Sequence, residues 1–145
     1  MNFLTAMNIS ASGLTAQRTR MNIVSMNLSH MHTTRTSTGE PYRRKIPIFT
    51  ATPLTGPFGK RLKSSLDRKL EVVEVTKIIE DQKDFKTVFD PSHPDADEFG
   101  YVRLPNVNLM EEMVQILTAK RSYEANIVAI NAAKNMALKS LELLK

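Results

Sequence analysis

The sequence predicts an α+β protein, with a long helix at each end of the chain and a small β-rich domain between them. Apolar residues recur at helical spacing over residues 3–31, and neither proline nor glycine occurs between 106 and 145. The stretch between these regions is rich in turn-forming and β-branched residues. We therefore expect a discontinuous helical assembly domain, residues 1–32 plus 106–145, and a β-rich middle domain with loops, residues 33–105.

The first predicted helix has a heptad pattern, because Met7, Leu14, Met21 and Leu28 recur every seven residues. Its opposite face carries Asn, Ser, Thr and Gln instead of the charged residues that solvent-facing helices prefer. A small, uncharged second face suits close packing on several sides. Gly13 and the many short polar residues lower the helix propensity, so we expect this helix to form only when it is packed.

The middle of the chain contains three predicted strands. "YRRKIPIFTA" (42–51) is a short strand that Pro47 places near a sheet edge, because proline cannot donate to a ladder. "LEVVEVTKIIE" (70–80) and "FKTVF" (85–89) have the β-branched and alternating character of strands. The cluster "DPSHPDADEFG" (90–100) that follows predicts a turn.

The last predicted helix begins after Pro105, where either Asn106 or Asn108 can cap it, and Asn108 with Glu111 has the spacing of a capping box. Some 37 helical residues would span about 55 Å, more than a compact domain of this size can bury. We expect the two terminal helices to pair as an antiparallel or staggered coiled coil. This pairing still leaves Val128, Ala132 and Ala133 uncovered on one side and Ile9 and Ile23 uncovered on another. Exposed apolar patches of that kind indicate assembly.

The expected assembly interface consists of the apolar residues spaced along both helices. They are Leu4, Met7, Ala11, Leu14, Met21, Val24, Leu28, Met110, Met113, Val114, Leu117, Tyr123, Ile127, Val128, Ile130, Ala137, Leu141 and Leu144.

Charge is divided unevenly within the middle domain. Residues 35–69 carry nine bases and two acids, whereas residues 70–100 carry nine acids and three bases. The basic segment 42–69 supports an alternative function, a nucleic-acid-binding adaptor, since cationic runs grip phosphates. No known nucleic-acid-binding motif accompanies it, and neutralisation by the acidic half, within one chain or between copies, is the simpler interpretation.

Catalysis and metal binding find little support. His30, His32 and His93 lack a spacing that would converge on a metal, and nothing fixes Asp90, Asp95 or Asp97 relative to them. The chain has no cysteine and none of the common catalytic motifs. Glu111, Glu112 and Glu124 are explained by capping, the helix dipole and surface solvation. We expect no enzyme activity, no cofactor and no metal.

The distribution of apolar and charged residues predicts neither a membrane segment nor a signal peptide. No run of about 18 apolar residues predicts an integral membrane segment. The start of the chain, "MNFLTAMNISASGLTAQR", has no basic residue before Arg18 and no long apolar block. We therefore expect no cleaved signal peptide.

Motifs at both ends resemble the axial proteins of the bacterial flagellum, the rod and hook family, and most closely those of the proximal rod. At the N-terminus these are "SASGLTAQRTRMNIVSMNLSH" (10–30), "TTRT" and "GEPYRRK" (39–45). At the C-terminus they are "DPSHPDADEFGYVRLPNVNLMEEMV" (90–114) and "RSYEANIVAINAAKNM" (121–136). One departure is "NLSHMHT", where the family has "NLANxxT", so that Ser29 and His30 replace Ala and Asn at the helix exit. We hypothesise that His30 makes a pH-dependent contact there.

The resemblance implies a structural subunit of the rod, the drive shaft that crosses the periplasm and transmits torque. It implies export by the flagellar type III apparatus and assembly through the terminal helices. The implied partners are copies of the same chain and other rod proteins, with contacts to the MS ring and the LP ring.

Overall fold

The computed structural model describes residues 3–53 and 70–142 of the chain. Within them the elements follow in order: helix α1 (Phe3–Ser29), strands β1 (Lys45–Pro53), β2 (Glu71–Glu80), β3 (Lys86–Phe89) and β4 (Tyr101–Leu104), and helix α3 (Leu109–Glu142). This order confirms the predicted α+β class with two long terminal helices.

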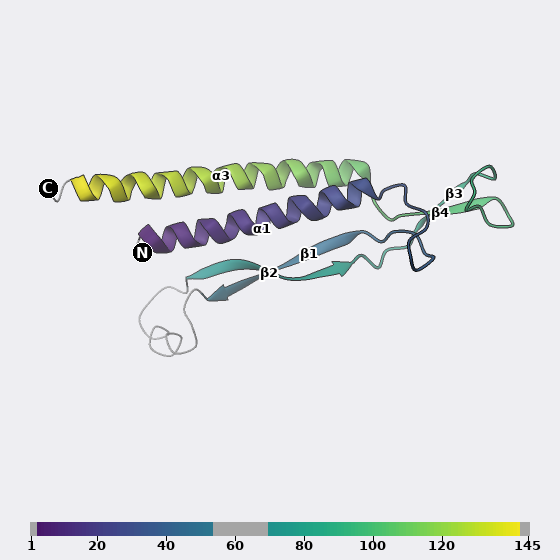
Figure 1. The fold of residues 1–145 in the computed structure, drawn as a ribbon, viewed down its shortest axis with the longest axis horizontal. Coiled ribbons are helices and arrows are strands. Elements are labelled where there is room, and N and C mark those ends of the chain that lie inside the picture. Colours follow the sequence, from purple (N-terminus) through teal and green to yellow (C-terminus); the bar gives the residue numbers. More distant parts are fainter. Residues whose placement is uncertain (1–2, 54–69, 143–145) are drawn as a thin grey trace.

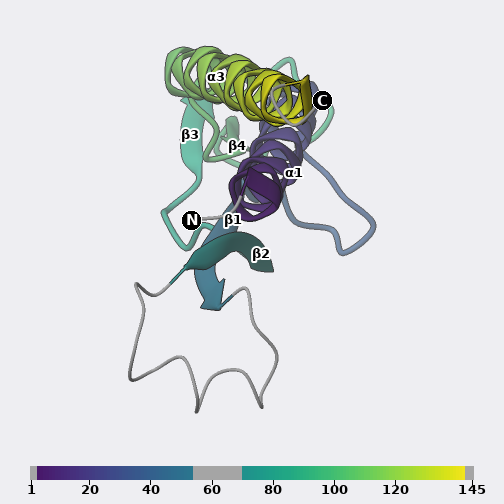
Figure 2. The same ribbon diagram turned by 90° about the vertical axis from the view of Figure 1, so that its left-hand side faces the viewer.

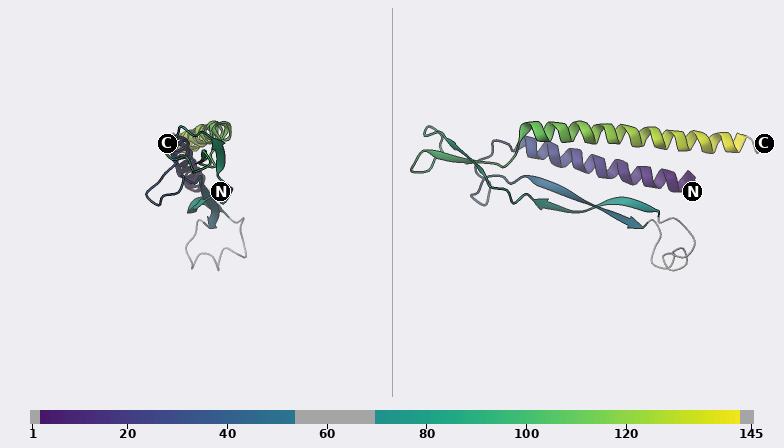
Figure 3. Two further views of the ribbon diagram at one scale, coloured as in Figure 1. Left: turned by 90° about the vertical axis from the view of Figure 1, so that its right-hand side faces the viewer. Right: turned by 180° about the vertical axis from the view of Figure 1, so that it is seen from behind.

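The described part of the molecule is elongated and built in layers around α1. Helices α1 and α3 lie side by side and antiparallel, and the β1–β2 hairpin runs along the other side of α1 (Figure 1). Seen end-on, α3, α1 and the hairpin are stacked in that order (Figure 2). The hairpin and both helices run nearly parallel to the long axis, whereas β3 and β4 form a projection at one end (Figure 3).

The small neutral face of α1 packs against the hairpin. Ser12 Oγ accepts a hydrogen bond from the backbone N–H of Val73 at 3.2 Å, and Ala16 is buried nearby. These short side chains therefore let α1 come close to strand β2 as well as to helix α3. On the α3 side, a Cβ at Gly13 would lie 2.9 Å from Asn126 Nδ2, so glycine permits the two helices to come close. The helix continues through Gly13 without a break.

Within residues 3–53 and 70–142, both sheets are two-stranded and antiparallel. β1 pairs with β2 from Lys45↔Glu80 to Pro53↔Glu71, with a register shift after Ile48 where Thr76 is extra on β2. β3 pairs with β4 from Lys86↔Leu104 to Phe89↔Tyr101. The three predicted strands are confirmed. The fourth strand was not predicted, because its four residues are too few for alternation to be visible.

The described residues bury little apolar surface. Eight apolar residues are buried, three of them alanines, whereas twenty large apolar side chains are exposed. A monomer with so small a core depends on further contacts for much of its order. None of the helices in residues 3–53 and 70–142 is long and apolar enough to cross a membrane.

Two glycines with positive φ provide a matched test of this fold. Gly39 has φ 82° and open space around its Cβ position, whereas at Gly100 (φ 81°) a Cβ would lie 2.9 Å from Phe89 Cε2. Alanine at either site incurs the left-handed backbone cost of about 1–2 kcal/mol. We predict that Gly100→Ala also displaces the Phe89 ring and lowers the free energy of unfolding by about 1–3 kcal/mol more than Gly39→Ala. Urea unfolding of the two variants measures the difference, and equal losses would contradict it.

Candidate assembly surface

An apolar stripe runs along the side of α3 that faces away from α1. Met110, Val114, Leu117 and Val128 are 68%, 60%, 57% and 67% exposed. Their spacings of four, three and eleven residues place them on one side of a helix with 3.6 residues per turn. Ala119 and Ala133, which are buried, lie on the opposite side. Helix α3 is therefore apolar on two sides, and α1 covers only one of them.

The sequence-predicted interface residues divide into three groups. Exposed residues are Leu4, Ala11, Met110, Met113, Val114, Leu117, Ile127, Val128 and Leu141. Half-buried residues are Met7, Leu14, Met21, Leu28, Tyr123, Ile130 and Ala137. Val24 is buried and offers no surface to a partner, and Leu144 lies outside the described residues. Five residues were expected outside the helix pair. Val128 and Ala132 are exposed and Ile9 is half-buried, but Ile23 and Ala133 are buried, which makes the expectation wrong for these two.

The C-terminal end of α3 extends past the first turn of α1 (Figure 1). With 34 residues against 27, α3 is longer by about 10 Å at 1.5 Å per residue. Met136, Leu138 and Leu141 are all exposed in this end of the helix. The extension adds apolar surface beyond the reach of α1.

A buried ionic cluster fixes the other end of the helix pair. Glu112, in the first turn of α3, is fully buried, and its Oε1 accepts a hydrogen bond from Arg44 Nε at 2.6 Å. Arg44 NH1 also contacts Asp81 Oδ2 at 3.3 Å. Burial tends to lower the pKa of Arg44, but hydrogen bonds and charges from Glu112 and Asp81 outweigh burial and raise it. One guanidinium thus joins β1 to the end of β2 and to α3.

Asn27 connects the C-terminal end of α1 to the same cluster. Its Nδ2 donates to the Lys45 carbonyl at 2.9 Å and to Glu112 Oε2 at 3.1 Å. Its Oδ1 accepts from Tyr42 OH and from the Lys45 backbone N–H, both at 2.9 Å. Asn27 is 1% exposed, and these bonds use its donors and acceptors in full. Asn106 similarly accepts from Arg44 N and donates to the Asp81 and Lys83 carbonyls.

Local sequence patterns do not indicate the roles of Glu112 and Asn27. Glu112 was assigned to dipole and solvation effects, but it is a buried partner of Arg44. The signal for Asn27 was its position, because it follows Ile23 and Val24 by four and three residues and so shares their buried face. Asn108 does cap α3, since its Oδ1 accepts from Met110 N at 3.1 Å.

The basic segment is partly used inside the chain. Arg44 pairs with Asp81, so a base from the first half of the middle domain meets an acid from the second half within one chain. Arg43 lies 4.3 Å from the Phe85 ring centroid, a cation–π geometry. The bases at 60–69 lie outside the described residues.

The helix exit at "NLSHMHT" forms a compact turn. The Thr33 backbone N–H donates to the His30 carbonyl at 3.0 Å, and His30 Nδ1 lies 3.2 Å from Thr33 Oγ1. The His30 ring also stacks on Tyr42 at 4.8 Å between centroids. His30 therefore contacts the residue that binds Asn27, and its hypothesised pH dependence remains a prediction.

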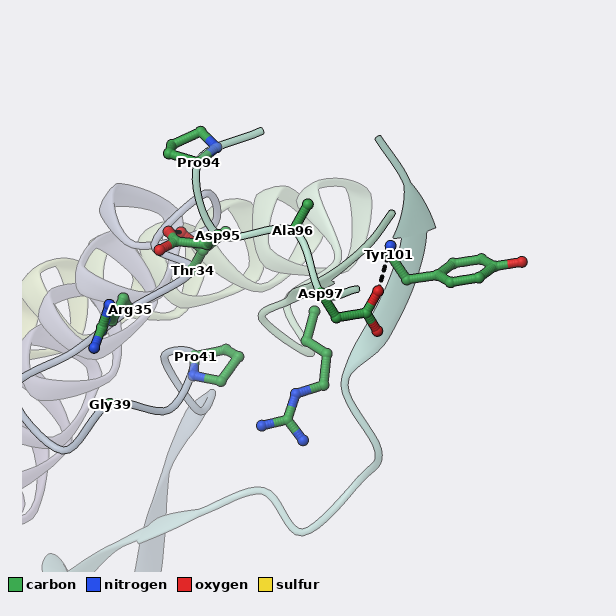
Figure 4. A pocket seen from close by; sticks show the side chains of 10 residues that line it. Thr34, Arg35, Gly39, Pro41, Pro94, Asp95, Ala96, Asp97 and Tyr101 are labelled. Atoms are coloured by element: carbon green, nitrogen blue, oxygen red, sulfur yellow. Dashed lines mark hydrogen bonds between the residues drawn. The ribbon is translucent and has the colours of Figure 1, made fainter. Parts of the chain in front are cut away.

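A shallow polar hollow lies between the loops that precede β1 and β4 (Figure 4). Thr34 Oγ1 donates to Asp95 Oδ2 at 2.6 Å, which joins the two loops. Asp97 Oδ1 accepts from the Tyr101 N–H at 2.8 Å, while the Tyr101 ring points away from the hollow. Asp90 Oδ1 accepts from Ser92 Oγ and N, and these bonds hold the pKa of Asp90 below its usual range. The acidic side chains of this region thus shape turns. In the described part of the chain, no three His, Cys, Asp or Glu side chains are grouped as metal ligands.

Comparison with known proteins assigns this architecture to a class. Residues 100–143 match the family described as "Flagellar basal body rod FlgEFG protein C-terminal", and relatives over nearly the full chain are named as flagellar basal-body rod proteins, so the chain is a structural, non-enzymatic component of the flagellar basal body. The flagellar basal-body rod protein FlgC of Bacillus subtilis (strain 168) is 44% identical over 95% of both chains. FlgC of Borreliella burgdorferi is 41% identical over 100% of this chain and 99% of its own. FlgC of Escherichia coli O6:H1 is 37% identical over 99% and 98%. The chain belongs to the FlgC family of flagellar basal-body rod proteins.

We predict that Arg44→Gln lowers the free energy of unfolding by about 3–5 kcal/mol, because it leaves the Glu112 carboxylate buried without its cation. Arg43→Gln is the matched control and should cost about 0.5–1 kcal/mol, the worth of an exposed cation–π contact. Urea unfolding followed by circular dichroism measures both variants. Similar losses would show that the buried pair is not the stronger constraint.

Tyr42 gives a pH prediction. Burial, and secondly the charges of Glu112 and Glu80, raise the pKa of Tyr42 above 10.0. The folded state therefore holds the phenolic proton more tightly than the unfolded state, and stability falls as pH rises from about 10 through the raised pKa. Tyr42→Phe should lower the free energy of unfolding by about 1 kcal/mol at neutral pH. Above pH 10 the stability of this variant should fall less steeply than that of the parent protein.

The control for this experiment is Tyr101→Phe, because the Tyr101 side chain is exposed and stacks edge-on against Phe89. The stability of this control should fall at alkaline pH as steeply as that of the parent protein. Unfolding curves between pH 8 and pH 11 provide the measurement, and parallel declines for the parent and Tyr42→Phe would refute the assignment to Tyr42.

Proposed function

We propose that this rod subunit assembles through the apolar surface of its paired helices, and that the exposed side of α3 contacts the neighbouring subunits. The observation that carries the proposal is an exposed apolar stripe on the side of α3 that does not pack on α1. The stripe consists of Met110, Val114, Leu117 and Val128. Burying a side chain of this size contributes about 1.5–3 kcal/mol, so a few such contacts hold subunits together. Residues 1–32 and 106–145 are the proposed assembly domain and 33–105 the proposed middle domain.

The buried cluster supports this role by making the protomer stiff where its parts join. Arg44, Asn27 and Glu112 tie both helices to the start of the hairpin, and Asn106 ties the approach to α3 to the end of β2. A subunit of a drive shaft must transmit torque between neighbours without bending between its own elements. A satisfied polar network that joins several elements provides this rigidity.

The relatives are named as basal-body rod proteins, and we propose that this chain occupies the proximal rod, which crosses the periplasm. Its proposed partners are copies of itself and other rod proteins. Export through the flagellar type III apparatus and contacts with the MS and LP rings are part of the same proposal and rest on the family resemblance. The nucleic-acid alternative has no support in the family or in the use of Arg44 within the fold.

We predict that Val128→Asp prevents incorporation into basal bodies while the monomer keeps its helix content, because Val128 is 67% exposed and contributes little to the intramolecular core. The matched control is Asn8→Asp, which adds the same charge at an exposed polar position of α1. Cells that carry each variant as their only copy are scored for motility and for the subunit in isolated basal bodies. Normal incorporation of Val128→Asp would contradict the proposed surface.

A further inference from the structure

The loop between β3 and β4 is built from turns in which a side chain accepts a hydrogen bond from the backbone N–H two residues later. Asp90 Oδ1 accepts from Ser92 N at 3.1 Å, and Asp97 Oδ1 accepts from Phe99 N at 3.0 Å. Carboxylate and amide oxygens commonly shape turns in this way. Such a turn persists as long as its acceptor atom carries no proton.

His93 forms a turn of the same kind with a ring nitrogen in place of an oxygen. Its Nδ1 accepts a hydrogen bond from the Asp95 backbone N–H at 3.1 Å. Because the donor is a backbone N–H, Nδ1 is unprotonated in this arrangement, and the neutral ring carries its proton on Nε2. The contact excludes the imidazolium form, in which both ring nitrogens are donors.

The contact of His30 has no such requirement. Its Nδ1 lies 3.2 Å from Thr33 Oγ1, and a hydroxyl can donate or accept. Protonation of His30 therefore leaves that hydrogen bond possible, whereas protonation of His93 removes the acceptor of the Asp95 N–H.

The turn at His93 is connected to the body of the molecule through Asp95. The Asp95 Oδ2 accepts from Thr34 Oγ1 at 2.6 Å (Figure 4). Thr34 belongs to the segment that follows α1, where the neighbouring Thr33 carbonyl accepts from the Tyr42 backbone N–H at 3.1 Å. His93 therefore fixes the backbone of the residue whose carboxylate ties the β3–β4 projection to the rest of the chain.

Charged groups on several elements surround this turn. Asp90 lies on the same loop, close enough for its charge to interact with that of His93. Hydrogen bonds from the Ser92 hydroxyl and then from the Ser92 N–H hold the pKa of Asp90 low, so this carboxylate stays ionised near neutral pH. Two further carboxylates and two guanidiniums line the adjacent hollow: Asp95, Asp97, Arg35 and Arg103. The carboxylates attract an imidazolium away from the Asp95 N–H, and the guanidiniums oppose its charge.

We infer that His93, Asp95 and Thr34 form a proton-operated latch of the β3–β4 projection. With a neutral ring, His93 holds the Asp95 backbone, and Asp95 holds Thr34. When the ring takes up a proton, the Asp95 N–H loses its acceptor, the tie to Thr34 loosens and the projection moves more freely. Histidine ordinarily changes charge between about pH 5 and pH 8, whereas carboxylates do so near pH 4. The latch lies within one subunit and is independent of the proposed assembly surface.

Nuclear magnetic resonance of the ¹⁵N-labelled protein between pH 5 and pH 8 tests the latch. At pH 8 the ring nitrogens of His93 should show the Nε2–H tautomer. On acidification, the protection factor of the Asp95 amide against hydrogen exchange should fall about fivefold, as expected for the loss of one hydrogen bond. The backbone order parameters of β3 and β4 should fall over the same pH range. An Nδ1–H tautomer at pH 8, a constant Asp95 protection factor or constant order parameters would each overturn the inference.

Two asparagine variants assign the response to one ring. His93→Asn keeps an uncharged acceptor for the N–H two residues later, so Asp95 should stay protected at both ends of the pH range. His30→Asn is the matched control and should retain the pH response of the parent protein. A response that persists in His93→Asn, or one that is lost in His30→Asn, would overturn the role of His93.

Thr34→Val separates the two steps of the latch, because it removes the hydroxyl that binds Asp95 and keeps the turn at His93. The Asp95 protection factor should still fall on acidification, but the order parameters of β3 and β4 should be low at both pH 5 and pH 8. Order parameters that depend on pH as they do in the parent protein would show that the tie to Thr34 does not hold the projection, and the latch would be refuted.

Discussion

The contact between Arg44 and Glu112 is the constraint on which the rest of the described structure depends. Glu112 is fully buried near the start of α3, so its charge requires a cation. Arg44, the residue directly before β1, provides it at 2.6 Å. Asn27 binds the second carboxylate oxygen and fixes the end of α1 against the same point. The two helices and the hairpin therefore share one junction, from which all three extend in the same direction.

This arrangement explains how a chain with so few buried apolar residues keeps a defined shape. Hydrophobic burial is nondirectional, and a small core of alanines and valines permits helices to slide. A guanidinium held by two carboxylates, and an amide with all its partners, permit only one register. The polar junction fixes how the elements align, while apolar side chains of α3 and the hairpin stay exposed in the described residues.

Sequence patterns predicted the elements better than the contacts between them. Heptad spacing and the absence of proline and glycine predicted both helices, and β-branched runs predicted three of the four strands. Periodicity shows that a helix has an apolar side, but it does not show what covers that side. The expectation that Ala133 lay outside the helix pair was wrong for this reason, because α3 has apolar residues on two sides and the pattern does not tell which one faces α1.

Polar residues were the hardest to place, since their roles depend on partners far away in the chain. Glu112 binds Arg44 across 68 positions and Asn27 across 85. Near a helix start a carboxylate has a sufficient local explanation in the dipole, so nothing local pointed to burial. The layered order of the elements was equally hidden, because it depends on which side of α1 the hairpin takes. That order places the α3 stripe and the hairpin on opposite sides of α1, and no periodicity within one element shows it.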